Sequence, residues 1–353
     1  MTSALTWPSI LTKLIDRTDL TRAESSWVMG QFLGGETPEP VMAGFMTAMR
    51  AKGETVAELS GLVDAMLLNS VKLDTGSDAV DIVGTGGDLI GTVNISSMAS
   101  ILVASAGIPV LKHGSRSASG KTGSSEMLEA LGIRLDQTPE QVAEVFRKVG
   151  ITFFFAPVFH PAMRFVGPVR KALGVPTTFN FLGPLANPVQ PIATSLGVSN
   201  ATMAPLLAQE LAARGRTGLV FRGNDGLDEL STVADSQIWQ VVGGEVQQHE
   251  LQPTKLGLAK VDVDSLLGGD AVQNAAVARD LFAGESGGNL GAIKDIVLLN
   301  AAGGVVAYEL AKDPSRSDVS LELRFEDALQ KVTTALESGA AAEKVADWVA
   351  ATA

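Results

Sequence analysis

The sequence predicts an α/β protein with two domains. Residues 1–73 carry apolar side chains at helical spacing and show no strand signal, which predicts a small N-terminal α-helical domain. From Ala79 onward, short β-branched runs alternate with amphipathic segments, an order typical of a central, mainly parallel sheet covered by helices. We therefore expect a helical domain at 1–73 and a large α/β domain at 74–353.

Helix start signals divide the N-terminal domain into four expected helices. Apolar residues at 10–15 mark the first helix. Thr21 with Glu24, and Thr55 with Glu58, have the spacing of capping boxes, in which each side chain bonds the backbone N–H of the other. They start the second and fourth helices, and the third lies between them.

Two loops rich in small residues follow expected strands at 80–83 and 108–111. The first, GTGGD at 84–88, lets backbone N–H groups approach a ligand, and a helix start follows it. Polar groups suited to an anion stand at that helix start, on Thr92, Asn94, Ser96 and Ser97. The second loop, KHGSRSASGK at 112–121, holds three cations and three hydroxyls. Together the loops predict a phosphate site, whereas singly they also fit a plain turn and a solvated surface.

The rest of the chain continues the alternation of strands and helices. The other expected elements are a helix at 139–149, a strand at 151–155, a helix around 163–173, an irregular segment at 183–191, a helix from Asn200, a strand at 218–221, an acidic loop at 223–229, a hairpin at 237–242 with its turn at 243–244, helices at 271–282 and 293–310, and two terminal helices.

Composition narrows the class of protein. With 46% hydrophobic residues in 353, the chain is long and apolar enough for a substantial core. The absence of cysteine excludes disulfides and thiolate metal sites, and a net charge of -12 argues against a nucleic-acid partner. The N-terminus lacks the pattern of a secretory signal, and the most apolar run, 98–111, is too short to span a bilayer. We expect a cytoplasmic protein without a membrane partner.

Several motifs together resemble the anthranilate phosphoribosyltransferase family. They are GTGGD at 84–88, NISS at 94–97, KHGSR at 112–116, GSSEMLEALG at 123–132, the long run at 155–188, GNDGLDELS at 223–231 and GGDAVQNAA at 268–276. The resemblance implies the nucleoside phosphorylase/phosphoribosyltransferase-like fold, a helical domain completed by a segment near 163–190, and a homodimer. It also implies the second step of tryptophan biosynthesis from chorismate. In that step the 5-phosphoribosyl group of phosphoribosyl pyrophosphate (PRPP) passes to the amine of anthranilate, and pyrophosphate is released.

The same resemblance implies the site residues, none of them a general acid or base. For PRPP they are Gly84, Gly87, Asp88, Thr92, Asn94, Ile95, Ser96, Ser97, Lys112, His113, Gly114, Ser115, Arg116, Ser117, Ala118, Ser119, Gly120 and Ser124. For anthranilate they are Gly84, His113, Ser115, His160, Arg170, Gly183 and Pro184. For Mg²⁺ they are Ser96, Asp228 and Glu229.

The chemistry of these residues suits those roles, although each has a plainer reading. Magnesium takes oxygen ligands, commonly one or two carboxylates plus substrate phosphates, so adjacent Asp228 and Glu229 suit it. Alone, such a pair is usually solvated. Arg170 presents a planar fork that matches a carboxylate, but it also reads as a surface charge. His113 and His160 also read as packed core residues.

Three positions depart from the family pattern. Ser115 stands where the family has Asn, Gly120 where it usually has a second Ser, and Leu89 where Gly is common. Because the Asn contacts the aromatic substrate, Ser115 leaves open a phosphoribosyltransferase with another aromatic amine as acceptor. A pyrimidine nucleoside phosphorylase-like enzyme and a non-catalytic paralogue that binds nucleic acid are further candidates.

Overall fold

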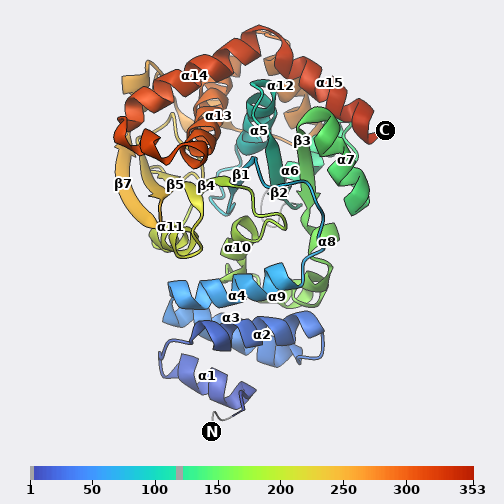
Figure 1. The fold of residues 1–353 in the computed structure, drawn as a ribbon, viewed down its shortest axis with the longest axis vertical. Helices are drawn as coiled ribbons and strands as arrows, with labels where there is room; N and C mark the ends of the chain where they lie inside the picture. The colour runs from blue at the N-terminus through green and yellow to red at the C-terminus, as the bar shows by residue number, and fades with distance from the viewer. Residues whose placement is uncertain (1–3, 117–121) are drawn as a thin grey trace.

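The computed structural model describes residues 4–116 and 122–353, and it has the expected fold class. Figure 1 shows a stack of N-terminal helices beneath a sheet that is covered by further helices. The stacked helices are α1 (Trp7–Ile15), α2 (Arg22–Gly34), α3 (Glu39–Lys52) and α4 (Val56–Leu68). Both predicted capping boxes form, at Thr21–Glu24 and at Thr55–Glu58, so the sequence signals for these two helix starts are confirmed.

The sheet has seven strands in the order β3-β2-β1-β4-β5-β6-β7. They are β1 (Val80–Gly84), β2 (Val110–Gly114), β3 (Ile151–Phe155), β4 (Ala193–Gly197), β5 (Thr217–Gly223), β6 (Ser236–Val242) and β7 (Glu245–Leu251). Strands β1 to β5 run parallel, and the predicted hairpin β6–β7 adds an antiparallel edge. The prediction of a mainly parallel sheet is therefore confirmed.

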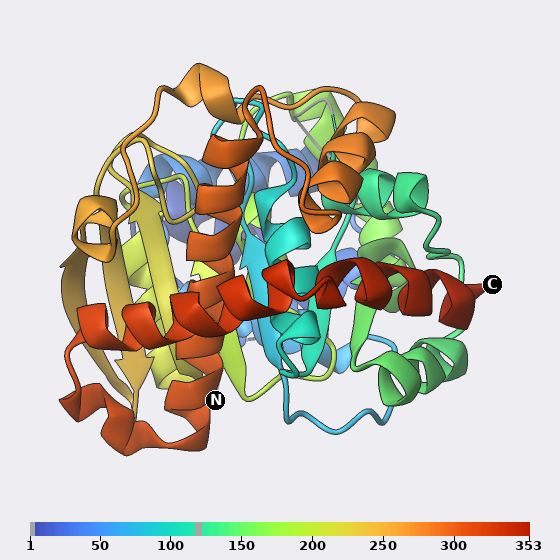
Figure 2. The ribbon, with the colours of Figure 1, turned by 90° about the horizontal axis from the view of Figure 1, so that it is seen from above.

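Helices cover both faces of the sheet. On one face lie α5 (Ile95–Ser105), α13 (Leu290–Lys312), α14 (Leu321–Glu337) and α15 (Ala340–Thr352). Figure 2 shows α14 running across α13, and α15, which contacts α5, continuing beyond it. The other face packs on α11 (Met203–Ala213) and on the N-terminal bundle. Successive residues of β1 serve the two cores, since Ile82 belongs to the first and Val83 to the second. The bundle thus shares a core with the sheet.

Shorter helices complete the chain around the sheet. They are α6 (Ser124–Leu131), α7 (Pro139–Val149), α8 (Ala156–Phe159), α9 (Gly167–Leu173), α10 (Phe179–Leu182) and α12 (Ala271–Phe282). Helix α9 contacts α3, and α10 contacts α4, so both pack back on the N-terminal bundle.

Two elements differ from the prediction. The helix expected around 163–173 is broken into a 3₁₀ turn, Pro161–Phe165, and α9, because Pro168 cannot donate the hydrogen bond that a continuous helix needs. Strand β4 was not predicted, since its sequence ATSLG lacks β-branched apolar residues. Within the described part of the chain, α13 is the one helix long and apolar enough to span a membrane, whereas the run 98–111 was expected to be too short. In the apolar 18-residue window of α13, 72% is buried, as expected of a core helix.

Candidate active site

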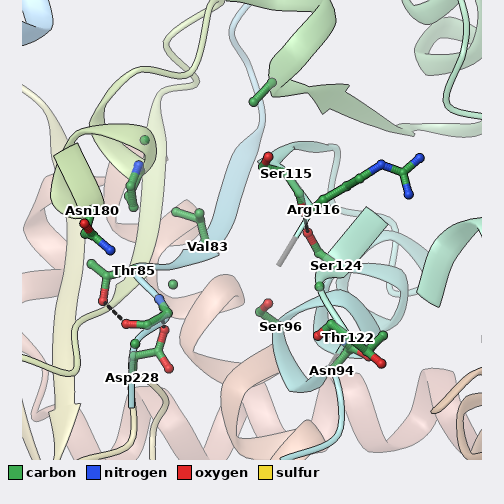
Figure 3. Close-up of a pocket in the computed structure, with 18 of the residues that line it drawn as sticks. Val83, Thr85, Asn94, Ser96, Ser115, Arg116, Thr122, Ser124, Asn180 and Asp228 are labelled. Carbon is green, nitrogen blue, oxygen red and sulfur yellow. Dashed lines mark hydrogen bonds between the residues drawn. The ribbon is translucent and has the colours of Figure 1, made fainter. Parts of the chain in front are cut away.

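A cavity of about 890 Å³ opens at the carboxyl ends of the parallel strands. Gly84 at the end of β1 and Gly114 at the end of β2 line it, while Met66 of α4 and Asn180 close it from the helical side. Figure 3 shows Thr85 and Asp228 on one side, and Asn94, Ser96 and Thr122 on the other. The fold thereby gathers the first predicted loop, residues 112–116 of the second, the acidic loop and the segment near Arg170 around one space.

Within the described residues, all but one of the predicted site residues line this cavity. They are Gly84, Gly87, Asp88, Thr92, Asn94, Ile95, Ser96, Lys112, His113, Gly114, Ser115, Arg116, Ser124, His160, Arg170, Gly183, Pro184, Asp228 and Glu229. Ser97 is the exception, because one helical step beyond Ser96 turns it into the core, where it is 1% exposed. Ser117, Ala118, Ser119 and Gly120 lie outside the described residues.

The glycine loop after β1 is shaped around the acidic loop. The Gly86 N–H donates to Asp228 Oδ2 at 2.7 Å, and a Cβ on Gly84 would lie 2.3 Å from the same oxygen. Gly86 and Gly87 have φ of +67° and +84°, where glycine adopts the left-handed region without strain. Leu89 shares that region at φ +61° and is 78% exposed at the rim of the cavity. Its departure from the family's Gly therefore falls where a side chain is strained.

Three carboxyl groups lie close together beneath this loop. Burial, and then the charge of Asp88, raises the pKa of Asp228 to about 7. Burial, and then the charge of Asp228, raises the pKa of Glu229 well above its usual range, although Lys112 opposes the shift. Buried carboxylates that repel one another gain from a bound cation.

Asp228 and Glu229 suit magnesium better than a metal that needs an all-protein cage. Among residues 4–116 and 122–353, no group of three or more His, Cys, Asp or Glu forms a metal site. Magnesium is usually held by one or two carboxylates and completes its shell with water and substrate phosphates. The pair therefore fits Mg²⁺ that is shared with a phosphorylated ligand.

Lys112 places a cation between the strand ends. Its Nζ donates to the Ile82 carbonyl at 2.5 Å and to Ser96 Oγ at 3.3 Å. Burial lowers the pKa of this 2%-exposed ammonium, while the charges of Asp81 and Glu229 oppose the shift. The group stands beside the carboxylates, at the base of the cavity.

The wall opposite the carboxylates is held by residues that the sequence analysis did not single out. Asn274 donates to Asn94 Oδ1 at 2.8 Å and accepts from the Gly269 N–H at 2.8 Å. Asn94 in turn donates to the Thr122 carbonyl at 3.3 Å. Asn274 belongs to the motif GGDAVQNAA, which carried the family resemblance but suggested no chemical role. Its buried amide orients Asn94 toward the cavity.

Two neutral imidazoles line the other end of the cavity. His113 Nδ1 donates to the Gly183 carbonyl at 3.0 Å, and His160 Nε2 donates to the Ala186 carbonyl at 2.8 Å. Burial, and then His160, lowers the pKa of His113 to about 3, and burial lowers that of His160. Their ring centroids lie 5.2 Å apart, edge to face. At pH 7 both rings are uncharged.

Arg170 and Arg116 differ in what they face. Arg170 on α9 is half-buried at the cavity, burial lowers its pKa, and it has no ion pair with any residue that the structure describes. The reading of Arg170 as a surface charge is therefore wrong. Arg116 instead pairs with Glu129 at 3.1 Å and lies over the Phe155 ring. Figure 3 shows its guanidinium pointing away from the other labelled residues.

Comparisons with known proteins cover both parts of the chain. The helical bundle domain of a glycosyl transferase family matches residues 8–70, and the a/b domain of that family matches residues 76–342. The chain is 50% identical over 352 residues to an anthranilate phosphoribosyltransferase of Leifsonia xyli subsp. xyli, covering 100% of each chain.

Solved structures agree with this match. The anthranilate phosphoribosyltransferase of Thermus thermophilus has a TM-score of 0.87 and 36% identity, covering 97% of this chain and 99% of that one. The Saccharomyces cerevisiae enzyme in complex with PRPP and Mg has a TM-score of 0.85 at 24% identity, covering 98% and 97%, and it supports the fold alone. With both domains matched and half of its residues shared with a relative of equal length, the chain belongs to the anthranilate phosphoribosyltransferase family.

Proposed function

We propose that the cavity is the active site of this family's reaction, the transfer of the 5-phosphoribosyl group of PRPP to the amine of anthranilate. One observation carries the proposal. The carboxylates of Asp228 and Glu229 lie beside the glycine loop in the same cavity whose other end holds Arg170 and two neutral imidazoles. The first half suits a polyanion with a cation, and the second suits a small aromatic acid.

PRPP would lie between the glycine loop and the start of α5. The backbone N–H of Gly87 and the side chains of Asn94, Ser96 and Ser124 supply donors to phosphate oxygens. Each charge-assisted hydrogen bond contributes roughly 1.5–3 kcal/mol. Asp228, Glu229 and Ser96 would hold Mg²⁺, which supplies positive charge to the departing pyrophosphate. The yeast enzyme, which shares this fold, was solved in complex with PRPP and Mg.

Anthranilate would enter at the opposite end of the cavity. The guanidinium of Arg170 offers two parallel donors to the substrate carboxylate, which orients the ring. The imidazoles of His113 and His160 bring no competing charge, because burial keeps both neutral. Met163, Phe179 and Pro184 add apolar lining for the aromatic ring.

The reaction then requires position more than proton transfer. The bond from C1 of the ribose to the pyrophosphate oxygen breaks, its electron pair leaves with pyrophosphate, and the amine nitrogen bonds to C1 from the opposite face. Lys112 and the loop N–H groups stabilise the charge that gathers on the leaving group. The amine of anthranilate becomes more acidic as it bonds to C1, and its proton passes to water. No side chain is assigned as an obligate base.

The assembly and the place of action follow from the same assignment. We propose a helical domain at 1–73 completed by residues near 163–190, with 74–353 forming the α/β domain, which the packing of α9 on α3 supports. A homodimer through the helical domain is supported by exposed Ile15 and Leu68 on α1 and α4. We propose that the enzyme acts in the cytoplasm.

Removal of both carboxylates tests the assignment. The wild type should form N-(5-phosphoribosyl)anthranilate from PRPP and anthranilate when Mg²⁺ is present, and it should not cleave a pyrimidine nucleoside with phosphate. Replacing Asp228 and Glu229 together by Ala should reduce kcat/KM by about 1,000-fold or more at any Mg²⁺ concentration, because the pyrophosphate charge loses its counterion.

A matched control uses another adjacent acidic pair. Glu326 and Asp327 are exposed on α14, so their double replacement by Ala should leave turnover unchanged. Near-normal activity of the Asp228/Glu229 variant across a Mg²⁺ titration would contradict the assignment.

A further inference from the structure

The sheet is split beside the active site. Strands β1 and β4 pair over five residues, as do β2 and β3, but β1 and β2 pair only at Val80 and Val110. The Val80 N–H donates to the Pro109 carbonyl at 3.0 Å. In a parallel ladder the next bonds would join Ile82 N–H to the Leu111 carbonyl and His113 N–H to the Ile82 carbonyl. Those pairings are absent from these described strands.

Three side chains bond three of the four backbone groups that the split leaves without a strand partner. Asn187 donates to the Leu111 carbonyl at 2.8 Å, Asp81 accepts from the His113 N–H at 3.1 Å, and Lys112 donates to the Ile82 carbonyl at 2.5 Å. Asp81 and Asn187 also bond each other at 2.9 Å. They are 1% and 3% exposed and do not line the cavity. Each buried polar group costs folding free energy unless it has a hydrogen-bond partner. The side-chain bonds across the split therefore stabilise this particular arrangement of the strands.

Asn187 connects this network to the acceptor end of the cavity. It directly follows the segment 183–186, in which the Gly183 and Ala186 carbonyls accept hydrogen bonds from the rings of His113 and His160. Asp81 holds the backbone of His113 from the strand side. The Asp81–Asn187 bond therefore fixes, at both attachment points, the position of the two imidazoles.

We propose that Asp81 and Asn187 are positioning residues for the aromatic acceptor. Their side chains bond the backbone N–H of His113 and the carbonyl of Leu111 in β2, which the β1 backbone would otherwise bond. They thereby hold the strand ends apart and set the spacing of the two imidazoles. This inference rests on the proposed function, because it takes the imidazole end as the anthranilate end. Loss of the pair should weaken acceptor use while PRPP binding, on the opposite wall, is retained.

Two variants break the same bond in different ways. Asn187→Ala removes the donor to Asp81 and to the Leu111 carbonyl. Asp81→Asn keeps the shape but offers one acceptor oxygen instead of two, so one of its two bonds is lost. We expect each variant to raise the KM for anthranilate by about tenfold or more, because misplaced binding groups are costly. The KM for PRPP should stay within about threefold.

Asn300 provides a matched control on the other side of the site. It is 1% exposed on α13, donates to the Leu230 carbonyl at 2.8 Å and accepts from the Leu230 N–H at 2.9 Å, directly after the carboxylates. Asn300→Ala should shift the PRPP or Mg²⁺ requirement and leave the KM for anthranilate within about threefold. A role in general stability predicts the same kinetic profile for all three variants.

The outcomes separate this inference from the proposed function. If the wild type fails to join PRPP and anthranilate, the proposed function fails. If the wild type is active but Asn187→Ala and Asp81→Asn raise both KM values equally, or leave both unchanged, the positioning role is wrong. If Asn187→Ala does not fold, as judged by circular dichroism, the isosteric Asp81→Asn variant decides by the same criterion.

Discussion

The charge states of individual side chains around the cavity depend on burial more than on residue type. Lys112 and His113 are adjacent in sequence, yet one places its cation beside the carboxylates and the other carries an uncharged ring. The residue types and the spacing of the motifs predicted which side chains meet. They did not predict Asn274, because an amide that bonds another amide has no signature in sequence. Nor did they predict that Arg116 faces Glu129, since a rotamer depends on neighbours thirteen residues away.

The departure at Ser115 yields a prediction about the acceptor. Ser115 is exposed at the cavity rim, where its carbonyl accepts from Ser124 Oγ at 3.4 Å. Asn would add an amide donor and a carbonyl acceptor within reach of the substrate. Ser115→Asn should therefore raise kcat/KM for anthranilate, with a gain in transition-state stabilisation of up to about 1 kcal/mol, the usual net value of one hydrogen bond.

Ring-substituted anthranilates serve as the comparison in that measurement. If Ser115 makes room for a bulkier acceptor, Ser115→Asn should impair that acceptor and leave anthranilate unimproved. An unchanged profile across all acceptors would mean that position 115 does not contact the substrate.

Burial of His113 predicts a pH dependence of stability. Its pKa is about 3 in the folded protein and near 6.5 in an unfolded chain, so only the unfolded chain takes up a proton between these values. The contribution is complete above pH 6.5 and is lost as the pH falls toward 3, at about 1.4 kcal/mol per pH unit. From pH 7 to pH 5.5, the wild type should lose about 1 kcal/mol more unfolding free energy than His113→Gln.

Urea unfolding of both proteins at the two pH values provides the measurement. Every other titrating group is common to the two proteins, so the difference isolates His113. Equal losses in the two proteins would show that the ring titrates normally in the folded state.

At the scale of elements, β4 shows where sequence patterns fail. Its sequence ATSLG has no β-branched apolar run, yet it is the central strand and is buried throughout. The small residues are required by contacts that are distant in sequence, because a Cβ on Gly197 would lie 1.7 Å from the Asp228 carbonyl oxygen. The helix starts, by contrast, were predictable because a capping box is a contact between residues three apart.

This close approach predicts the effect of a small substitution. Gly197→Ala should displace the Asp228 backbone and reduce kcat/KM by about 100-fold, the loss typical of a 1 Å misplacement. Gly30→Ala is the control, since nothing lies within 4 Å of its Cβ in helix α2, and it should gain up to about 1 kcal/mol of stability at full activity. Full activity of Gly197→Ala would show that the carboxylates do not depend on this contact.

At the scale of the whole molecule, the fold class was predictable but the joining of its parts was not. Alternation of strands and helices predicted a parallel sheet, because the pattern is local. The core that the helical bundle, α10, α11 and one sheet face share includes pairs such as Phe32 and Phe179, which are far apart in sequence. The family resemblance, rather than periodicity, indicated that residues near Arg170 pack on the bundle.

The proposed dimer is tested on the intact protein. Light scattering at micromolar concentration should give twice the mass of 36.7 kDa, because the exposed apolar residues of α1 and α4 would be covered by a second copy. Ile15→Glu with Leu68→Glu should shift the mass toward that of one chain. An Ile15 and Leu68 double variant that keeps the wild-type mass would place the interface elsewhere, and a monomeric wild type would rule the dimer out.

In the gap between β1 and β2, the distance between the two strands depends on side chains, so amino-acid substitutions can change it. Where backbone hydrogen bonds join two strands, the strands lie about 4.8 Å apart in every protein, and a side-chain substitution does not change that distance. Here the side chains of Asp81, Asn187 and Lys112 bond the backbone groups in place of a strand ladder, so a substitution at any of them should change the spacing of β1 and β2. Asp81 and Asn187 do not line the cavity, so a substitution at either can change the shape of the acceptor end without replacing a residue that lines it.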